Sequence, residues 1–216
     1  MAVITEQARL GDWLKWELEG LMSRKKVTVG AGDLVSGTVM GKITLGAATP
    51  TAFATNAVNT GTCGTVTVGK GAIPGTYKVL MIEPGSNVGT FIVEDPNGLI
   101  IGKGAVAAAF SAGGIGFTIA DGATDFIAGE GFDIVVAAGT GYYIALDKDA
   151  TDGSYVAAGI LVENVDASTA AKEGVIIDNN ARIDTRMLTW KDAEAGDKVI
   201  ALATLESLGI VAGAIG

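Results

Sequence analysis

The sequence predicts a mainly β protein with one C-terminal helix, in which a small mixed β domain is interrupted by an inserted antiparallel, sandwich-like β domain. The chain holds 32 glycines but only 4 prolines and 6% aromatic residues, which is typical of short strands joined by tight turns. Its apolar runs are short and end at turn residues, and a helical period stands out in one window near the C-terminus. With 216 residues the chain can form one large or two small domains.

Residues 1–22 allow two interpretations. Several apolar residues recur at helical spacing and would share one helix face, including Leu10, Trp13, Leu14 and Leu18. Residues 14–19 instead alternate apolar and polar, as a half-buried strand does. Gly11 and Gly20 bracket the alternation. We therefore expect an extended N-terminal arm over residues 1–22.

Two tryptophans, Trp13 and Trp16, lie within this arm. Large aromatic side chains are costly to leave in water. Either the tryptophans fold back on their own domain or they anchor a partner, and the sequence leaves both alternatives open.

A cluster of basic residues precedes the first regular strand. Ser23, Arg24, Lys25 and Lys26 precede Val27-Thr28-Val29, and residues 34–45 form the next candidate strand. Lysines on a strand edge discourage aggregation, so the cluster is either a solvated edge or a contact surface.

Residues 46–140 have a lower charge density and are rich in Gly, Ala and Thr, which marks them as an inserted module. The candidate strands are residues 65–68, 77–82, 90–94, 99–101, 116–119 and 132–137. Candidate turns are Ile73-Pro74-Gly75, Glu83-Pro84-Gly85 and Asp95-Pro96-Asn97-Gly98. The last is the strongest hairpin signal, because Pro96 presets φ and Asn-Gly accepts positive φ.

Residues 141–163 read as strand, acidic turn and strand, and predict a hairpin reversed at Asp152-Gly153. The acidic turn, residues 147–153, matches only the first two ligand positions of a calcium loop, so we expect no metal there. Two further strands are expected at residues 174–178 and 181–184.

The helix is expected over residues 193–208, followed by Gly209 as its C-terminal cap and by an edge strand at residues 210–212. Its apolar stripe comprises Val199, Leu202, Ala203, Leu205 and Leu208. We expect this stripe to lie on the sheet of the hairpin.

Composition excludes several classes of function. The chain has no histidine, which removes the commonest general base and metal ligand. We find no catalytic constellation and expect no cofactor. Cys63 is the single cysteine, so no internal disulfide forms and a reducing cytoplasm is the expected site of synthesis.

The balance of charge and hydropathy points to protein partners. A formal charge of −9 argues against nucleic acid, and no export signal or membrane span is expected. Apolar residues make up 49% of the chain, and the mean hydropathy is +0.42. Some of this apolar surface is expected to meet other chains.

Five segments, taken in order, resemble the lambda-type head decoration proteins of tailed bacteriophages. They are residues 23–29, 37–43, 152–161, 186–190 and 203–211. The matched regions, 23–45 and 141–212, cover 95 positions. Residues 46–140 depart from the short members of that family and resemble β modules inserted in longer relatives. Lys191 follows Trp190, where short members often carry proline.

The resemblance implies a discontinuous domain, residues 23–45 and 141–216, that forms a homotrimer. Such trimers sit at three-fold and quasi-three-fold positions of the expanded head and stabilise it. The partners implied are the major capsid protein and the chain itself, and the location implied is the outer surface of the virion. Contacts between copies or within the core are expected from Trp190, Leu202, Leu205 and Leu208.

The N-terminal arm suggests how the protein attaches. Its alternating side chains could add a strand to a sheet edge of the shell protein. The expected capsid-binding residues are Leu10, Trp13, Leu14, Trp16, Leu18, Ser23, Arg24, Lys25 and Lys26. The module at 46–140 would then face outward, where it could also make a weak contact with a host surface. An adhesion or fibre module of a phage tail or cell surface is the alternative function.

Overall fold

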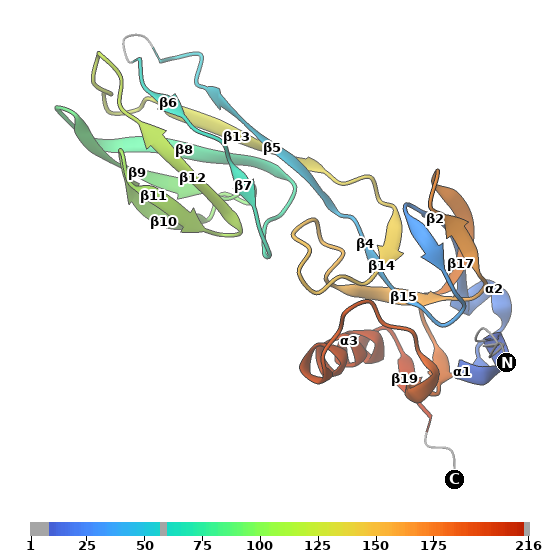
Figure 1. The fold of residues 1–216 in the computed structure, drawn as a ribbon. Coiled ribbons are helices and arrows are strands. Elements are labelled where there is room, and N and C mark those ends of the chain that lie inside the picture. Colours follow the sequence, from blue (N-terminus) through green and yellow to red (C-terminus); the bar gives the residue numbers. More distant parts are fainter. Residues whose placement is uncertain (1–8, 57–59, 214–216) are drawn as a thin grey trace, which may run out of the picture. The chain divides into compact units, whose positions relative to one another are not determined.

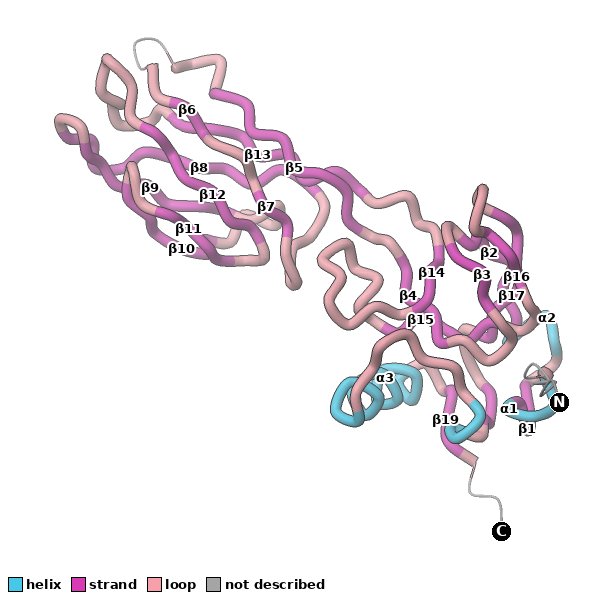
Figure 2. Tube along the Cα trace, viewed as in Figure 1, coloured by secondary structure: helices cyan, strands magenta, loops and turns pink. Residues whose placement is uncertain are grey.

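The computed structural model describes residues 9–56 and 60–213. It is mainly β, with helices confined to short stretches and one longer C-terminal helix (Figures 1 and 2). The chain divides into two compact units: unit 1 comprises residues 1–43 and 141–216, and unit 2 comprises residues 44–140. The predicted fold class is therefore confirmed.

Unit 1 is built around a closed five-stranded barrel in the order β14-β2-β17-β15-β4. Its strands are β2 (Arg24–Val29), β4 (Val39–Lys42), β14 (Tyr143–Ala145), β15 (Ala157–Leu161) and β17 (Lys172–Ile177). The barrel closes through antiparallel pairs and one parallel pair, β14 with β2. A separate two-stranded sheet joins β3 (Gly32–Leu34) to β16 (Val165–Ala167).

A three-stranded sheet in the order β1-β18-β19 carries both ends of the described chain. Its strands are β1 (Leu14–Glu17), β18 (Ala181–Ile183) and β19 (Ile210–Ala212). β18 pairs antiparallel with β1 and parallel with β19. The predicted edge strand at residues 210–212 is confirmed.

Helix α3 (Ala195–Ser207) follows the short 3-10 helix η1 (Thr185–Met187). Gly209 has a φ of +79°, a conformation that glycine adopts without the strain of a Cβ. The helix buries Ala201 and Leu205 in a core that also holds Ile160 and Ile183. The predicted helix and cap are therefore confirmed.

The predicted apolar stripe of α3 is wrong at Val199, which is 67% exposed, and at Ala203 and Leu208, which are exposed too. Ala201 occupies the core in its place. The helix has apolar residues on two faces, so spacing alone did not identify the buried one.

The hairpin predicted at residues 141–163 is wrong. β14 and β15 do not pair with each other, because β4 lies between them and pairs antiparallel with both. Gly41 of β4 makes this possible: a Cβ there would lie 1.9 Å from the backbone oxygen of Ser154. The connection between β14 and β15 can therefore pass close to β4.

Unit 2 is a sandwich of a five-stranded and a four-stranded sheet. The first, in the order β10-β9-β8-β13-β5, contains β5 (Leu45–Ala52), β8 (Gly75–Gly85), β9 (Val88–Glu94), β10 (Ile100–Ala105) and β13 (Gly131–Ala138). The second contains β6 (Thr62–Cys63), β7 (Thr67–Val68), β11 (Ala109–Ala112) and β12 (Ile115–Ala120). Its core includes a cluster of Phe91, Phe110 and Phe117, with ring centroids 5.1 to 5.9 Å apart.

Two turn predictions in unit 2 had different outcomes. Asp95-Pro96-Asn97-Gly98 joins the antiparallel pair β9 and β10, as predicted. Glu83-Pro84-Gly85 lies inside β8 instead, and Asn87 with a φ of 54° lies in the turn. β13 pairs with β8 only as far as Leu80. Beyond that residue β8 is paired with β9 alone, so the missing N–H of Pro84 is tolerated.

Candidate interaction surface

The N-terminal segment of unit 1 is docked on its own domain from α1 (Leu10–Trp13) onward. Residues 1–8 of the predicted arm lie outside the described residues. Residues 10–23 contain α1, β1 and the short helix α2 (Gly20–Ser23) instead of one continuous extended segment. The expected alternation is realised only over β1, which pairs with β18.

Trp13 is fully buried in the core of unit 1. Its indole Nε1–H donates to Ser36 Oγ (3.0 Å), and that hydroxyl donates to the Val162 carbonyl (2.7 Å). The Trp13 carbonyl accepts from the Asp184 amide (2.7 Å). Trp13 therefore fills its own domain and offers no surface to a partner in this structure.

Trp16, three residues later, is 53% exposed. Leu18 and Met22 are also exposed, whereas Leu10 and Leu14 are half-buried against the core. The segment thus presents three large apolar side chains to solvent within seven residues of chain. This density is unusual for a surface that meets only water.

Charged and polar groups hold the segment in place. Arg24 binds Glu17 through two hydrogen bonds, Nε to Oε2 (2.9 Å) and Nη2 to Oε1 (2.6 Å). The hydrogen bond to Glu17 raises the pKa of Arg24. Ser23 is buried and its hydroxyl donates to the Leu18 carbonyl (2.5 Å). Ser23 and Arg24 therefore anchor the segment internally.

β1 is the outer strand of its sheet among the described residues. The Leu18 amide donates inward to the Asn180 carbonyl (3.1 Å). Because strand amides alternate in direction, the Glu17 amide points away from β18. The exposed edge and Trp16 therefore belong to the same strand.

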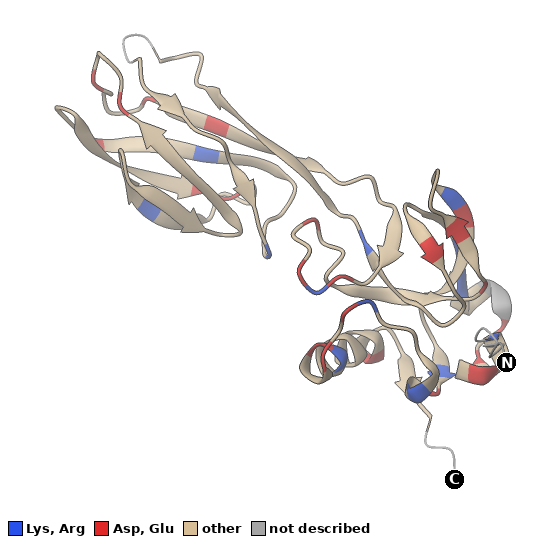
Figure 3. Cartoon of the chain, viewed as in Figure 1, with Lys and Arg blue, Asp and Glu red and all other residues tan. Residues whose placement is uncertain are grey.

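Lys25 and Lys26 of β2 are both exposed. Lys26 Nζ lies 2.7 Å from Glu173 Oε1, and Lys25 Nζ lies 3.6 Å from Asp178 Oδ2. Figure 3 marks basic and acidic positions along the strands of unit 1. Exposed pairs of this kind contribute little to stability, so these lysines can exchange their partners.

The four C-terminal residues singled out by the sequence differ in exposure. Leu205 is fully buried, while Trp190 and Leu202 pack half-buried against the same core. Lys198 Nζ lies 5.9 Å from the centroid of the Trp190 ring. Leu208 is 37% exposed. Leu205 is therefore a core residue, Trp190 and Leu202 pack against that core while partly exposed, and Leu208 has the largest exposed fraction of the four.

A second face of α3 was missed by the sequence reasoning. Val199 and Ile200 are 67% and 69% exposed, the highest values for large apolar side chains in the described part of unit 1. Gly196 and Ala203 on the same side are exposed too. The available signal was the Val199-Ile200 pair, since two consecutive helical residues cannot both face one core.

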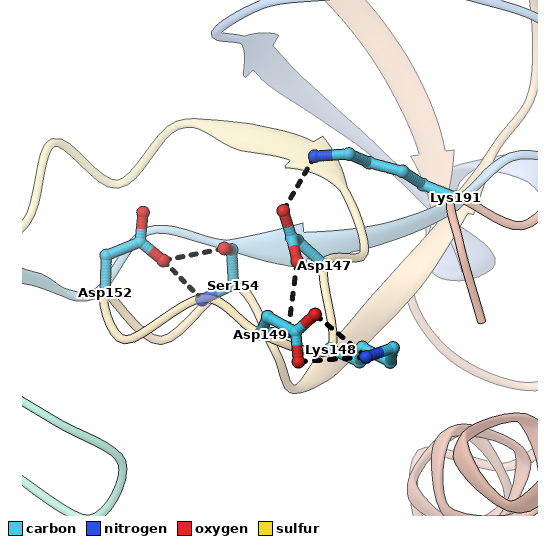
Figure 4. Close-up of polar contacts among 6 residues, drawn as sticks. All are labelled: Asp147, Lys148, Asp149, Asp152, Ser154 and Lys191. Atoms are coloured by element: carbon cyan, nitrogen blue, oxygen red, sulfur yellow. Dashed lines mark hydrogen bonds and ion pairs between the residues drawn. The ribbon is translucent and has the colours of Figure 1, made fainter. Parts of the chain in front are cut away.

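Hydrogen bonds within the acidic turn and one ion pair from Lys191 hold the connection between β14 and β15 (Figure 4). Lys191 Nζ donates to Asp147 Oδ2 (2.7 Å), and this hydrogen bond lowers the pKa of Asp147. Asp152 Oδ1 accepts from the amide (3.0 Å) and the hydroxyl (2.6 Å) of Ser154. No group of three potential metal-binding side chains occurs in the described residues.

A family model described as bacteriophage lambda head decoration protein D matches residues 3–210. A comparison with curated proteins finds no match. Two crystal structures of Xanthomonas campestris FlgL, in space groups H3 and C2, are each 18% identical with a TM-score of 0.34. Each alignment covers 48% of this chain and 33% of that chain. The chain thus spans about a third of their length.

Over the described residues, no helix combines the length and apolar character needed to cross a bilayer.

Proposed function

The chain belongs to the family of the bacteriophage lambda head decoration protein D, and from this premise we propose that it is a capsid cementing protein. The family is structural and associates with the phage capsid, so the chain is a virion component. In our proposal it binds as a homotrimer at three-fold and quasi-three-fold positions of the expanded head. Bound to the outer surface, it stabilises the shell after synthesis in the host cytoplasm.

Attachment to the major capsid protein is proposed to use the N-terminal segment. β1 has an unpaired outer edge among the described residues, and strand addition satisfies such an edge with main-chain hydrogen bonds. Trp16 and Leu18 would fill apolar pockets on the shell, since both are exposed. Trp13 has a different role: it holds the base of the segment in the core.

Contact between copies is proposed to use the exposed face of α3. An interface needs an apolar centre, and the exposed side chains of Val199 and Ile200 supply one. Three segments on one trimer raise the effective concentration of each, so a modest contact per copy becomes durable attachment.

Unit 2 is proposed to face outward from the shell. It has its own core, and residues 46–140 carry 7 acidic and 3 basic residues. An acidic outer surface keeps particles soluble and apart.

The observation that carries the proposal is the family match over residues 3–210. Co-sedimentation of the unchanged protein with expanded heads tests the cementing function, and a Trp16 variant tests the anchor. Trp16→Ala removes the exposed anchor, and we expect about a tenfold or greater loss of binding to expanded heads. Val156→Ala, which truncates another exposed apolar residue of unit 1, is the matched control. Co-sedimentation with expanded heads measures both, and unchanged binding of Trp16→Ala would contradict the anchor.

Strand addition is tested separately at Glu17. Glu17→Ala and Glu17→Pro both lose the ion pair with Arg24, but only proline also removes the outward N–H. We expect the proline variant to bind heads more weakly than the alanine variant. Equal binding by the two folded variants would exclude main-chain pairing at this edge.

A further inference from the structure

The barrel of unit 1 has one weak seam, between β2 and β14. β2 pairs with β17 from Arg24 to Val29. On its other side it meets β14 at a single residue pair, Val29 with Tyr143. From Lys25 to Thr28 this second edge has no strand partner within the described part of the chain.

The direction of the backbone groups along the seam follows from the Gly30 amide, which donates to the Tyr143 carbonyl (2.8 Å). The N–H and C=O groups of a strand residue point to one side, and the side alternates along the strand. The amides of Thr28 and Lys26 therefore face the seam, as does the Lys26 carbonyl. These groups form a template for one more strand.

A cavity of about 390 Å³ opens at this seam. Its walls include Lys25, Lys26 and Thr28 from β2, and Lys42, Gly141 and Tyr143 from the opposite side. All of these residues belong to unit 1. The unpaired edge thus borders a space that an extended chain can enter.

The cavity is lined mainly by positive charges, although the protein as a whole is negatively charged. Three lysines and one acidic residue, Glu173, line it, in a chain with a formal charge of −9. Lys26 and Glu173 form a pair whose side chains are 68% and 73% exposed, so water competes strongly for it. Lys42 Nζ lies 6.0 Å from the Tyr143 ring centroid and makes no ion pair within the described residues. Carboxylates are the complementary groups.

We propose that the seam binds an extended acidic segment of a partner polypeptide, which adds as a strand to β2. Main-chain hydrogen bonds to Lys26 and Thr28 would hold the segment, and side chains at alternate positions would place carboxylates against Lys26 and Lys42. The lysines select an acidic sequence. This surface is separate from β1 and goes beyond the proposed cementing function.

The probe is a fluorescein-labelled peptide of alternating Glu and Thr, added to the full-length protein. Anisotropy measures binding, and NMR hydrogen exchange reports on single amides. We expect tighter binding at about 20 mM than at about 200 mM salt, with slowed exchange at Lys26 and Thr28. Lys42→Gln should weaken binding by about threefold to tenfold. Lys78→Gln on β8 of unit 2, also an exposed strand lysine, should leave it unchanged.

Several outcomes would overturn the proposal. They are no binding at about millimolar peptide, equal binding of a peptide with Lys in place of Glu, and tighter binding of a DNA oligonucleotide. Binding that leaves exchange at Lys26 and Thr28 unchanged, or that Lys42→Gln does not weaken, would do the same. Because these measurements need no phage heads, their failure is distinguishable from failure of the cementing function, which co-sedimentation of the unchanged protein with expanded heads tests.

Discussion

Trp13 and Trp16 lie three residues apart and occupy opposite environments. Trp13 is fully buried with its indole N–H bonded to Ser36, whereas Trp16 is 53% exposed on the outer strand of its sheet. The same residue type therefore stabilises the fold at one position and is available for contact at the other.

Truncation should separate these two roles. We expect Trp13→Ala to lower the free energy of unfolding by about 3–5 kcal/mol, because it leaves a large cavity. Trp16→Ala should change it by about 0.5 kcal/mol or less, as an exposed substitution does. Chemical denaturation of the two variants measures both values. Equal losses would mean that Trp16 is also part of the core.

Asp184 couples the stability of unit 1 to pH. Its side chain is nearly buried, and its carboxylate accepts from Arg186 Nε (2.9 Å) and Nη2 (2.8 Å). The hydrogen bonds from Arg186 lower the pKa of Asp184 from 3.8 to about 2. A carboxyl whose pKa is lower in the folded state stabilises that state above its unfolded pKa. The stabilisation is lost as pH falls from about 4 towards 2.

Arg186→Met should reduce this dependence. We expect the variant to lose less stability than the unchanged protein between about pH 5 and pH 2, since its Asp184 has a more ordinary pKa. Arg186 is 77% exposed, so salt should weaken the effect. Arg182→Met, which removes another exposed positive charge, should retain the full dependence, as measured by denaturation at each pH.

At the scale of elements, glycines decide where strands can approach. A Cβ at Gly41 would lie 1.9 Å from the Ser154 backbone oxygen, whereas at Gly196 in α3 it would meet nothing within 4 Å. The close approach of Ser154 to β4 therefore requires glycine at position 41, whereas α3 has room for a side chain at position 196.

Alanine substitutions test this contrast. Gly41→Ala should cost about 3 kcal/mol or more, because backbone must move to accept the methyl group. Gly196→Ala should stabilise the protein by about 0.5 kcal/mol, because alanine favours helix. Thermal unfolding ranks the variants. An unchanged unfolding temperature for Gly41→Ala would show that the Ser154 backbone can move away from β4 at little cost.

At the scale of the whole molecule, the two units have separate cores. The core of unit 2 draws only on residues within 45–136, while those of unit 1 draw on residues outside that range. The chain leaves and re-enters unit 1 at adjacent points, where the Gly141 amide donates to the Ile43 carbonyl (3.0 Å).

Unit 2 should therefore be removable. Replacing residues 44–140 with a short Asn-Gly turn would join β4 directly to its antiparallel neighbour β14. We expect the shortened chain to fold and to bind expanded heads, since the attachment surface lies in unit 1. Circular dichroism and co-sedimentation measure these results. A folded variant that no longer binds would assign attachment to unit 2.

Local signals in the sequence were reliable where neighbours along the chain supply the structure. The α3 helix with Gly209 after it, and the Asp95–Gly98 turn, depend on residues within a few positions of one another. The order of short segments across the chain was enough to indicate the family, which the match over residues 3–210 shows.

Composition and short-range periodicity were enough to establish the β-rich class, the C-terminal helix and the absence of histidine chemistry. Long-range packing settles that Trp13 is buried and Trp16 exposed, that β4 separates β14 from β15, and that α3 exposes Val199. These features depend on contacts between residues far apart in the chain. An apolar side chain shows a preference for burial, but the packed neighbours decide which of two such side chains is buried.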